Sequence, residues 1–586
     1  MQRRQPGPDR VLPVTDTRLP VVLFWHMHQP HYRDALSGRY VFPWTYLHAI
    51  KDYVDMAAHL EAHAGARAVV NFTPVLMEQL EELAERVDAH LRHGEPVPDP
   101  VLALLSEDPL PTDPETRLAL LRACLRADRR NLIERYPDFA ELAQLAVSLG
   151  TPEQIGYASD QFLRDLGAWY HLAWMGETVR RNDERIARLV EQGRQFRPAQ
   201  RRVLLELVGE LLAGLLPRYR RLADSGRCEL AVSPYSHPIL PLLLDFHAAR
   251  ECEPNSPLPR HAAYPGGAER AAWHMQEALA VFRRVFGRDP RGCWPSEGAI
   301  SAGALQVIED AGIDWIASSS AVLRGALDES GISLTLDGAD HERLLNQAHR
   351  PASGRLNCFF RHDEVSDLIG FTYSKWHGDD AARHLMGELE RLADRTEGVP
   401  GRVVLVALDG ENAWEYYPFN GYWFLSAMYG ALAEHPRLKL TTLSAYVDDA
   451  RARGAEPHVL PKVRAGSWVH GTLSTWMGDP SKNAGWDLLC DAKLAYDRVL
   501  AEGRLSDSER HAVSRQLAQC ESSDWFWWFG DYNPPEAVAD FDRLYRHQLT
   551  SLYSMLKLEP PAALSTPLSV GRGAPEAGGV MRRTQA

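Results

Sequence analysis

The chain has 586 residues, more than one ordinary core can organise, and its 45% hydrophobic and 24% charged residues are typical of a soluble globular protein. Its formal net charge of -14 argues against a nucleic-acid partner, because phosphates would be repelled, and it is compatible with a neutral substrate. Seven dispersed cysteines without a CxxC pair predict neither a disulfide framework nor a zinc ribbon, and they indicate a reducing compartment.

The first residues are polar and rich in Pro and Arg, which predicts a disordered lead-in over residues 1–18. They lack the apolar core of a signal peptide, and no apolar run in the chain is long enough to span a membrane. We therefore expect a cytoplasmic protein with no membrane partner. The sequence makes no prediction of the oligomeric state.

Short apolar segments rich in β-branched residues recur along the next part of the chain and are typical of buried strands. They are residues 20–25, 66–72, 228–233, 292–294, 314–318, 358–360 and 402–408. Helical patterns fall between most of them, so strands and helices alternate as in a parallel α/β sheet. Seven such units are enough to close a barrel, and we predict a catalytic barrel of the α/β class over residues 19–445.

Two further regions are predicted to be helical. Residues 76–225 carry apolar residues at three- and four-residue spacing, which predicts a helical insertion in the barrel. Residues 446–558 contain helical patterns at 486–499, 507–522 and 535–556, which indicate a C-terminal helical domain. The tail over residues 559–586 is rich in Pro, Gly, Ala and Ser and is predicted to be disordered.

Two carboxylates stand just beyond predicted strands. Glu297 lies in a Trp-Pro-Ser-Glu-Gly turn, and Asp409 ends the apolar run 403–408. Barrel enzymes keep their catalytic groups at the carboxyl ends of the strands, and two such acids suit a reaction in which one gives a proton and the other attacks. For Asp409 the alternative is a simple helix cap. The apolar strand before Asp409, with Glu411 two residues on and Glu297 close in space, predicts a raised pKa for Asp409.

Histidines cluster at the ends of the first and third predicted strands. His26 and His28 point to one face if the first strand continues, because side chains alternate with period two. His237 follows the third strand, and Glu229 lies within it, where a buried charge should be paired or functional. For the histidines, contact with sugar hydroxyls, part of a metal site and a structural role remain as alternatives.

Tryptophans gather in the last quarter of the chain. Trp468 and Trp476 lie in Gly-rich polar loops and are predicted to contact a ligand, because Trp faces suit the apolar faces of pyranose rings. The aromatic run 525–529 is predicted to be a packing core between domains, with one Trp open to a ligand. Loops with Trp, carboxylates and His but no basic patch are typical of a carbohydrate-binding cleft.

Five segments resemble, in order, the motifs of a known family. They are His28–Pro30, Tyr235–Pro238, Trp294–Glu297, Asp409–Asn412 and, less closely, Gly466–Asp487. On these motifs the chain resembles glycoside hydrolase family 57, which includes α-amylases, amylopullulanases and 4-α-glucanotransferases. The resemblance implies an incomplete (β/α)7 barrel with a following helical domain, and a retaining double displacement without a metal or cofactor.

The resemblance also assigns roles to residues. It implies that Glu297 is the nucleophile and Asp409 the general acid/base, acting on α-1,4-glucans such as amylose, glycogen and maltodextrins. The α-amylase or amylopullulanase type is predicted, and a 4-α-glucanotransferase using the same carboxylates is the alternative. The first motif has His-Gln-Pro where the family's branching enzymes have His-Leu-Pro, which argues against branching. The predicted substrate contacts are His26, His28, Gln29, Glu229, Tyr235, His237, Trp294, Glu411, Trp468 and Trp476.

Two alternatives come from other classes of protein. A zinc-dependent deacetylase or α-mannosidase could use His26, His28, Asp409 and His237 as ligands around an open position. The sequence lacks a recognisable ligand set, which argues against this alternative. A non-catalytic glucan-binding protein could have kept the cleft, but both carboxylates are present with their surroundings intact.

Overall fold

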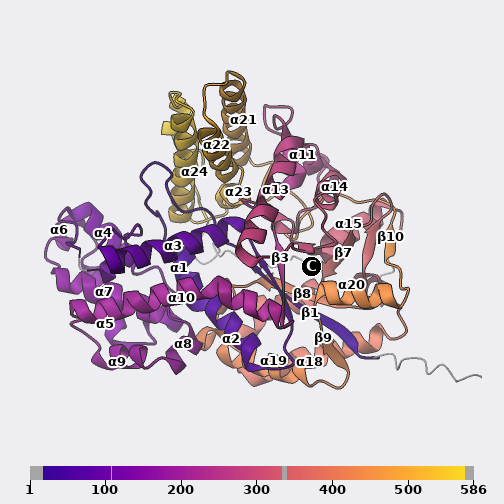
Figure 1. Cartoon of the computed structure of the whole chain (residues 1–586), viewed down its shortest axis with the longest axis horizontal. Helices are drawn as coiled ribbons and strands as arrows, with labels where there is room; N and C mark the ends of the chain where they lie inside the picture. Colours follow the sequence, from indigo (N-terminus) through magenta and orange to yellow (C-terminus); the bar gives the residue numbers. More distant parts are fainter. Residues whose placement is uncertain (1–16, 107, 333–338, 574–586) are drawn as a thin grey trace, which may run out of the picture.

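The computed structural model describes residues 17–106, 108–332 and 339–573. Within them, seven parallel strands close into a barrel (Figure 1). Each pairs with the next, and the last, β8, pairs with both β7 and β1. The strands are β1 (Leu19–Met27), β2 (Ala68–Phe72), β3 (Cys228–Val232), β4 (Gly292–Cys293), β5 (Trp315–Ser319), β7 (Asn357–Arg361) and β8 (Val404–Asp409). All seven predicted strands and the α/β barrel class are confirmed.

Three short strands were not predicted. They are β6 (His349–Pro351), β9 (Leu438–Leu440) and β10 (His458–Leu460), each of three residues. β9 pairs with β1 outside the barrel ladder, while β6 and β10 extend the sheet from β7. Three residues are too few to show a period-two pattern. β10 thus adds a strand to the sheet beyond residue 445, where the predicted barrel ends.

The alternation of side chains along β1 positions the site. Val22 and Phe24 point into the barrel and belong to its interior cluster, whereas the residues between them face the surrounding helices. Phe24 packs against the rings of Trp294 and Trp315, at centroid distances of 5.2 and 6.2 Å. His26 is the next inward position, so its ring lies above a packed aromatic floor.

Helices cover the barrel between its strands. They are α1 (Trp44–His48), α2 (Val54–Ala62), α11 (Leu240–Leu244), α12 (Ala248–Cys252), α13 (Gly267–Phe286), α14 (Ala302–Asp310), α15 (Ser320–Glu329), α16 (Ala339–Leu345), α17 (Asp363–Asp367), α18 (Gly378–Arg395), α19 (Tyr422–Ala433) and α20 (Leu443–Ala452). In the described part of the chain, no helix combines the length and the apolar character that a membrane crossing requires.

The helical insertion between β2 and β3 forms a lobe beside the barrel, purple in Figure 1. Its long first and last helices pack against each other and return the chain to the sheet. The insertion contains α3 (Pro74–His93), α4 (Pro114–Ala123), α5 (Pro137–Ser148), α6 (Pro152–Ile155), α7 (Asp160–Ala173), α8 (Glu177–Asn182), α9 (Glu184–Gln192) and α10 (Pro198–Asp224). The insertion's helices run from Pro74 to Asp224.

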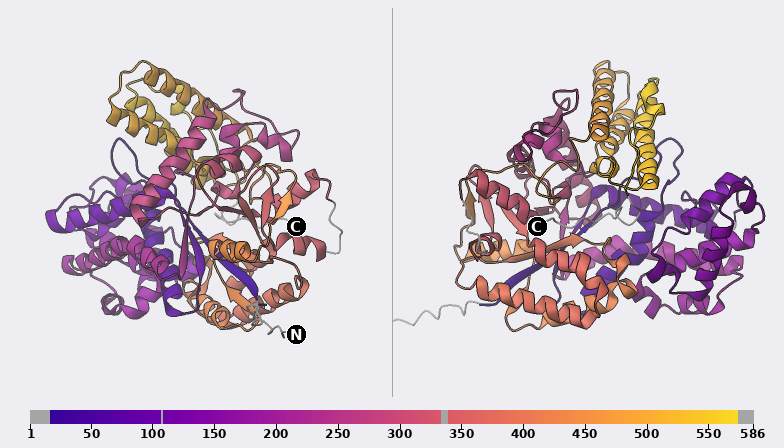
Figure 2. Two further views of the ribbon diagram at one scale, coloured as in Figure 1. Left: turned by 45° about the vertical axis from the view of Figure 1, so that its right-hand side comes forward. Right: turned by 180° about the vertical axis from the view of Figure 1, so that it is seen from behind.

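The C-terminal helices stand together at one end of the barrel in all three views (Figures 1 and 2). They are α21 (Pro480–Ala501), α22 (Asp507–Cys520), α23 (Ser523–Trp528) and α24 (Pro535–Met555). The three predicted helices correspond to α21, α22 and α24, and α23 is an additional short helix. Its first turn reaches the mouth of the barrel, where Ser523 and Asp524 enter the site described below.

The predicted disorder of the tail is wrong for residues 559–573. Leu568 N donates to Asp542 Oδ1 over 2.7 Å, and Gly573 N donates to Asn533 O over 3.0 Å. Asp542 is only 1% exposed, so the Leu568 amide satisfies a buried carboxylate on α24, and the Gly573 amide ties the end of the tail to the segment before that helix. Residues 574–586 and most of the predicted lead-in, residues 1–16, lie outside the described residues.

Candidate active site

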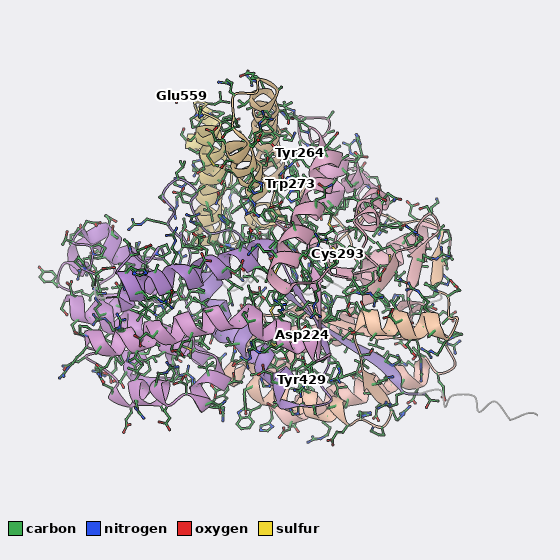
Figure 3. The ribbon with its side chains drawn as sticks, viewed as in Figure 1. Asp224, Tyr264, Trp273, Cys293, Tyr429 and Glu559 are labelled. Carbon is green, nitrogen blue, oxygen red and sulfur yellow. The ribbon has the colours of Figure 1, made fainter. Side chains whose placement is uncertain are left out.

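The carboxyl ends of the barrel strands open into a cavity of about 760 Å³. Its wall combines barrel loops with residues from the helical insertion and from α23 and α24. Figure 3 labels Cys293, the fully buried last residue of β4, four positions before Glu297. The predicted site residues in the cavity wall are His26, His28, Gln29, His237, Glu297, Asp409, Glu411 and Trp468.

Glu297 is fixed by contacts to both of its carboxylate oxygens. Trp468 Nε1 donates to Oε2 over 2.9 Å, and Ser523 Oγ donates to Oε1 over 3.3 Å. The backbone of Glu297 has a φ of 58°, in the left-handed region, which costs a non-glycine residue on the order of 1–3 kcal/mol. His237, its neighbour at 3.7 Å, has a φ of 63°. Strained backbone of this kind clusters at functional sites.

The pKa of Glu297 is raised to about 7. Burial is the main cause, because an ionised carboxylate loses its hydration there. The hydrogen bond from Trp468 acts in the opposite direction, and the negative charges of Asp524 and Asp409 raise the pKa further. The indole donor therefore favours the ionised form of a carboxyl that burial disfavours.

Asp409 ends β8 and pairs in register with His26 on β1. Burial raises the pKa of Asp409 to about 6, while the hydrogen bond from Asn412 Nδ2 to Oδ2, at 2.9 Å, acts against this rise. The positive charges of His28 and Arg361 also lower it. The predicted rise is present, but the charge of Glu411 is not among its causes.

Glu411 is a second buried carboxyl beside Asp409. His28 N and Gln29 Nε2 both donate to its Oε1, over 3.3 and 3.2 Å. Burial, followed by the charges of Asp409 and Asp52, raises the pKa of Glu411 well above its usual range. Burial thus favours the neutral form of this second carboxyl next to Asp409.

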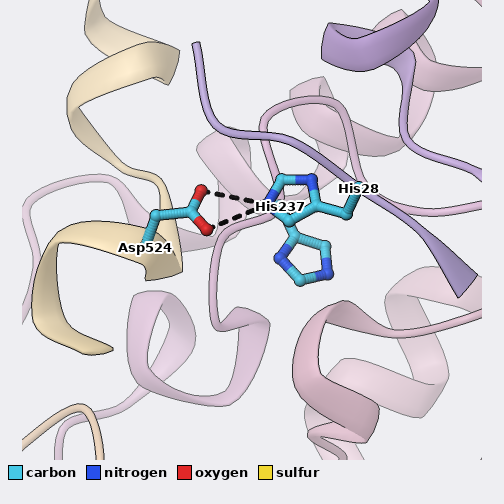
Figure 4. Close-up of side chains that lie close together, drawn as sticks. All are labelled: His28, His237 and Asp524. Carbon is cyan, nitrogen blue, oxygen red and sulfur yellow. Dashed lines mark hydrogen bonds and ion pairs between the residues drawn. The ribbon is translucent and has the colours of Figure 1, made fainter. Parts of the chain in front are cut away.

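Three side chains from distant segments meet next to Glu297 (Figure 4). His28 Nε2 contacts both oxygens of Asp524, at 2.9 and 3.0 Å, and the rings of His28 and His237 stack with centroids 4.0 Å apart. Asp524 was missed by the sequence reasoning, which read residues 525–529 as a packing core. The sequence feature that could have identified Asp524 is its charge, directly before a segment of five aromatic residues.

The structure corrects four predicted substrate contacts, because Glu229, Tyr235, Trp294 and Trp476 do not line the cavity. Glu229 lies near the start of β3, at the opposite end of the barrel from the carboxylates, and its oxygens accept hydrogen bonds from Trp315 Nε1 and Ser444 N, both over 2.9 Å.

The other three residues are covered by protein. Tyr235 is 2% exposed and donates to Glu78 Oε2 over 2.8 Å. Trp294 and Trp476 are fully buried, Trp294 in the aromatic floor and Trp476 against Trp527. Trp294 and Trp476 therefore support the wall of the cavity by packing behind it and do not reach the cavity themselves.

A closed parallel barrel with two buried carboxyls at the ends of its strands defines a barrel enzyme. The family model described as glycosyl hydrolase family 57 matches residues 22–459, most of the chain. The chain belongs to this family, as its motifs implied.

Solved structures agree with this fold. The chain is similar to a family 57 branching enzyme from Thermococcus kodakaraensis, with a TM-score of 0.56 and 15% identity over 92% of this chain and 89% of that chain. It is similar to a family 57 branching enzyme from Pyrococcus horikoshii, with a TM-score of 0.55 and 16% identity over 95% and 99% of the two chains. An α-amylase from Thermotoga maritima gives a TM-score of 0.54 and 15% identity over 92% and 94%. No curated protein matches the sequence.

Proposed function

We propose that this enzyme cleaves α-1,4-glucans by a retaining double displacement, with Glu297 as nucleophile and Asp409 as general acid/base. The observation that carries the proposal is the state of these two buried carboxyls. Both line one cavity, both have raised pKa values, and Glu297 is oriented by hydrogen bonds to both oxygens. A pair with raised pKa values can hold one proton near neutral pH, as this reaction requires.

In the first step, Asp409 donates its proton to the glycosidic oxygen while Glu297 attacks the anomeric carbon. The bond to the leaving sugar breaks and an ester bond to Glu297 forms. In the second step, Asp409 takes a proton from water, whose oxygen attacks the same carbon and releases Glu297. Trp468 and Ser523 orient the carboxylate of Glu297 for attack, and they donate hydrogen bonds to it again once the ester bond has broken.

The proton must lie on Asp409 when the reaction begins. In the free enzyme the pKa values of Glu297, about 7, and of Asp409, about 6, both lie near neutrality, so one proton can reside on either carboxyl. The glycosidic oxygen of a bound glucan accepts a hydrogen bond only from a protonated Asp409. A bound glucan therefore favours the state in which Asp409 holds the proton and Glu297 is ionised.

A 4-α-glucanotransferase remains a second candidate because the cavity extends beyond the carboxylates. Aromatic side chains from α1, the insertion and the C-terminal helices line this extension, including Trp44, Trp174, Trp528 and Phe541. A sugar held there would lie beside the reacting carbon and could replace water as the acceptor. The solved relatives include branching enzymes and an amylase at similar TM-scores, so fold likeness does not separate hydrolysis from transfer.

Maltoheptaose with product analysis tests both candidates. Rising reducing ends with shorter products support hydrolysis, and a ladder longer than the substrate supports transfer. Retention of the α-anomer at the first turnover, followed by NMR, tests double displacement. Glucan binding without turnover by the purified protein would refute the proposed activity.

The compartment is also a proposal. All seven cysteines are free, and six of them are buried. We propose that the enzyme works in a reducing cytoplasm, on glucans stored or degraded inside the cell.

A further inference from the structure

We propose that His28, His237 and Asp524 form a binding site for a divalent transition-metal ion of the Zn²⁺ class, and that metal and glucan exclude each other from the cavity. One potential ligand atom from each residue lies within 4.8 Å of the others. Ligand atoms on one zinc ion stand about 3 to 4 Å apart, given bonds of about 2.0–2.2 Å. The three side chains therefore need only a small contraction to share an ion.

Burial and unused bonding capacity point to a ligand at this place. His237 is 1% exposed, and its Nε2 has no hydrogen-bond partner among the described residues. An unpartnered buried polar atom costs free energy, which an ion bound at that lone pair would recover. The side chains of His28 and Asp524 are each 11% exposed, so the cluster is shielded yet open to the cavity.

Hydrogen bonds on the far side of each ligand prepare the donors. His28 Nδ1 lies 3.1 Å from Thr73 Oγ1, and His237 Nδ1 lies 3.0 Å from Ser523 Oγ. A proton on each Nδ1 would be donated to these oxygens, which leaves both Nε2 lone pairs for the ion. Such contacts fix the orientation and tautomer of metal-bound histidines.

The donor set selects the metal. Two imidazoles and one carboxylate suit Zn²⁺, Cu²⁺ and Ni²⁺, whereas Ca²⁺ and Mg²⁺ prefer oxygen ligands. Three protein ligands leave a fourth coordination position. An ion bound there would replace the direct contact between His28 Nε2 and Asp524 Oδ1, now 2.9 Å long.

The proposed consequence is competitive inhibition, and this part alone rests on the proposed function. The cluster lines the same cavity as Glu297 and Asp409. A bound ion would occupy the side chains of His28 and Asp524 that line this cavity, where a glucan would have to enter. The cell's free zinc level would then set the fraction of enzyme open to glucan.

The first experiment is calorimetric titration of the chelator-treated full chain with Zn²⁺ alone, followed by Co²⁺ absorption as a report of coordination. We expect one saturable equivalent. His237→Gln and Asp524→Asn should each weaken binding by more than about 100-fold, and Thr73→Val by about 10- to 100-fold. His261→Gln is the matched control, because His261 pairs with Asp491 over 2.9 Å without belonging to this cluster.

Circular dichroism confirms that each variant is folded, and His28→Gln supplies a third ligand variant. The absence of a saturable equivalent, or wild-type affinity in the folded ligand variants, would overturn the site. Inhibition by Zn²⁺ that weakens as maltoheptaose rises supports exclusion, and inhibition independent of glucan overturns it. An enzyme inactive on maltoheptaose would contradict the proposed function, while the calorimetry would still decide the metal site.

Discussion

The indole of Trp468 should control the ionisation of the proposed nucleophile. Trp468→Phe removes the N–H that donates to Glu297 Oε2 over 2.9 Å but keeps an aromatic ring against Trp294, whose centroid lies 5.0 Å away. A hydrogen bond to a charged group contributes about 1.5–3 kcal/mol. At 1.36 kcal/mol for each pKa unit, its loss should raise the pKa of Glu297 by about one to two units.

The sign follows from the role of Glu297. A nucleophile acts only when ionised, so a higher pKa moves the acidic limb of the kcat/KM profile to higher pH. Starting from a pKa of about 7, the ionised fraction at pH 6.5 should fall by about ten- to hundredfold. The assay is a profile of kcat/KM between pH 4 and 9 for reducing-end release from maltoheptaose, in the presence of a chelator.

Trp486→Phe is the matched control. It removes an indole donor of equal length, 2.9 Å to Trp476 O, in a fully buried residue without a contact to Glu297. Its acidic limb should match that of the wild type. An unmoved acidic limb in Trp468→Phe, with the variant folded and active, would refute the reasoning that this donor sets the pKa of Glu297.

Three further outcomes are expected. Glu297→Gln and Asp409→Asn should each lower kcat by orders of magnitude while maltoheptaose still binds by calorimetry, and near-normal turnover in either would remove its assigned role. Glu411→Gln should leave the basic limb of kcat/KM in place, because the charge of Glu411 is not among the causes of the raised pKa of Asp409; a shift of this limb to lower pH would support the like-charge effect expected from the sequence. Glu521→Gln should destabilise the fold by about 3–5 kcal/mol in thermal unfolding, since it leaves buried Arg270 without its carboxylate partner at 2.6 Å; an unchanged Tm would contradict this.

The barrel could be predicted because its information is local. Each strand is a short apolar segment. β1 is buried along almost its whole length, and the alternation of its side chains places His26 on the inward face. The three-residue strands carry no such pattern, because their pairing depends on neighbours from distant parts of the chain. The ordered tail is tied to the buried carboxylate of Asp542 through the backbone amides of Leu568 and Ser569, a contact that almost any residue type could make at these positions.

The site was predictable to the same extent. Glu297 and Asp409 stand at strand ends, where the barrel geometry brings catalytic groups together. Glu229 resembled these two residues in sequence, because a charge in a buried strand needs a partner. However, the position of a residue along its strand decides which end of the barrel it faces. Glu229 is the second residue of β3, and its partners come from Trp315 and Ser444 at the end away from the cavity.

The contribution of α23 could not be inferred from local patterns, and it changes how the domains are understood. Ser523 donates a hydrogen bond to Glu297, and Asp524 contacts His28, across 226 and 496 positions in the chain. The C-terminal helices are therefore part of the site, because they complete the hydrogen bonding of Glu297 and close one wall of the cavity. A barrel ending at residue 445 would also lack Trp468, the stronger of the two donors to Glu297 by distance. Chemistry in this enzyme thus depends on the docking of a helical domain onto the barrel mouth.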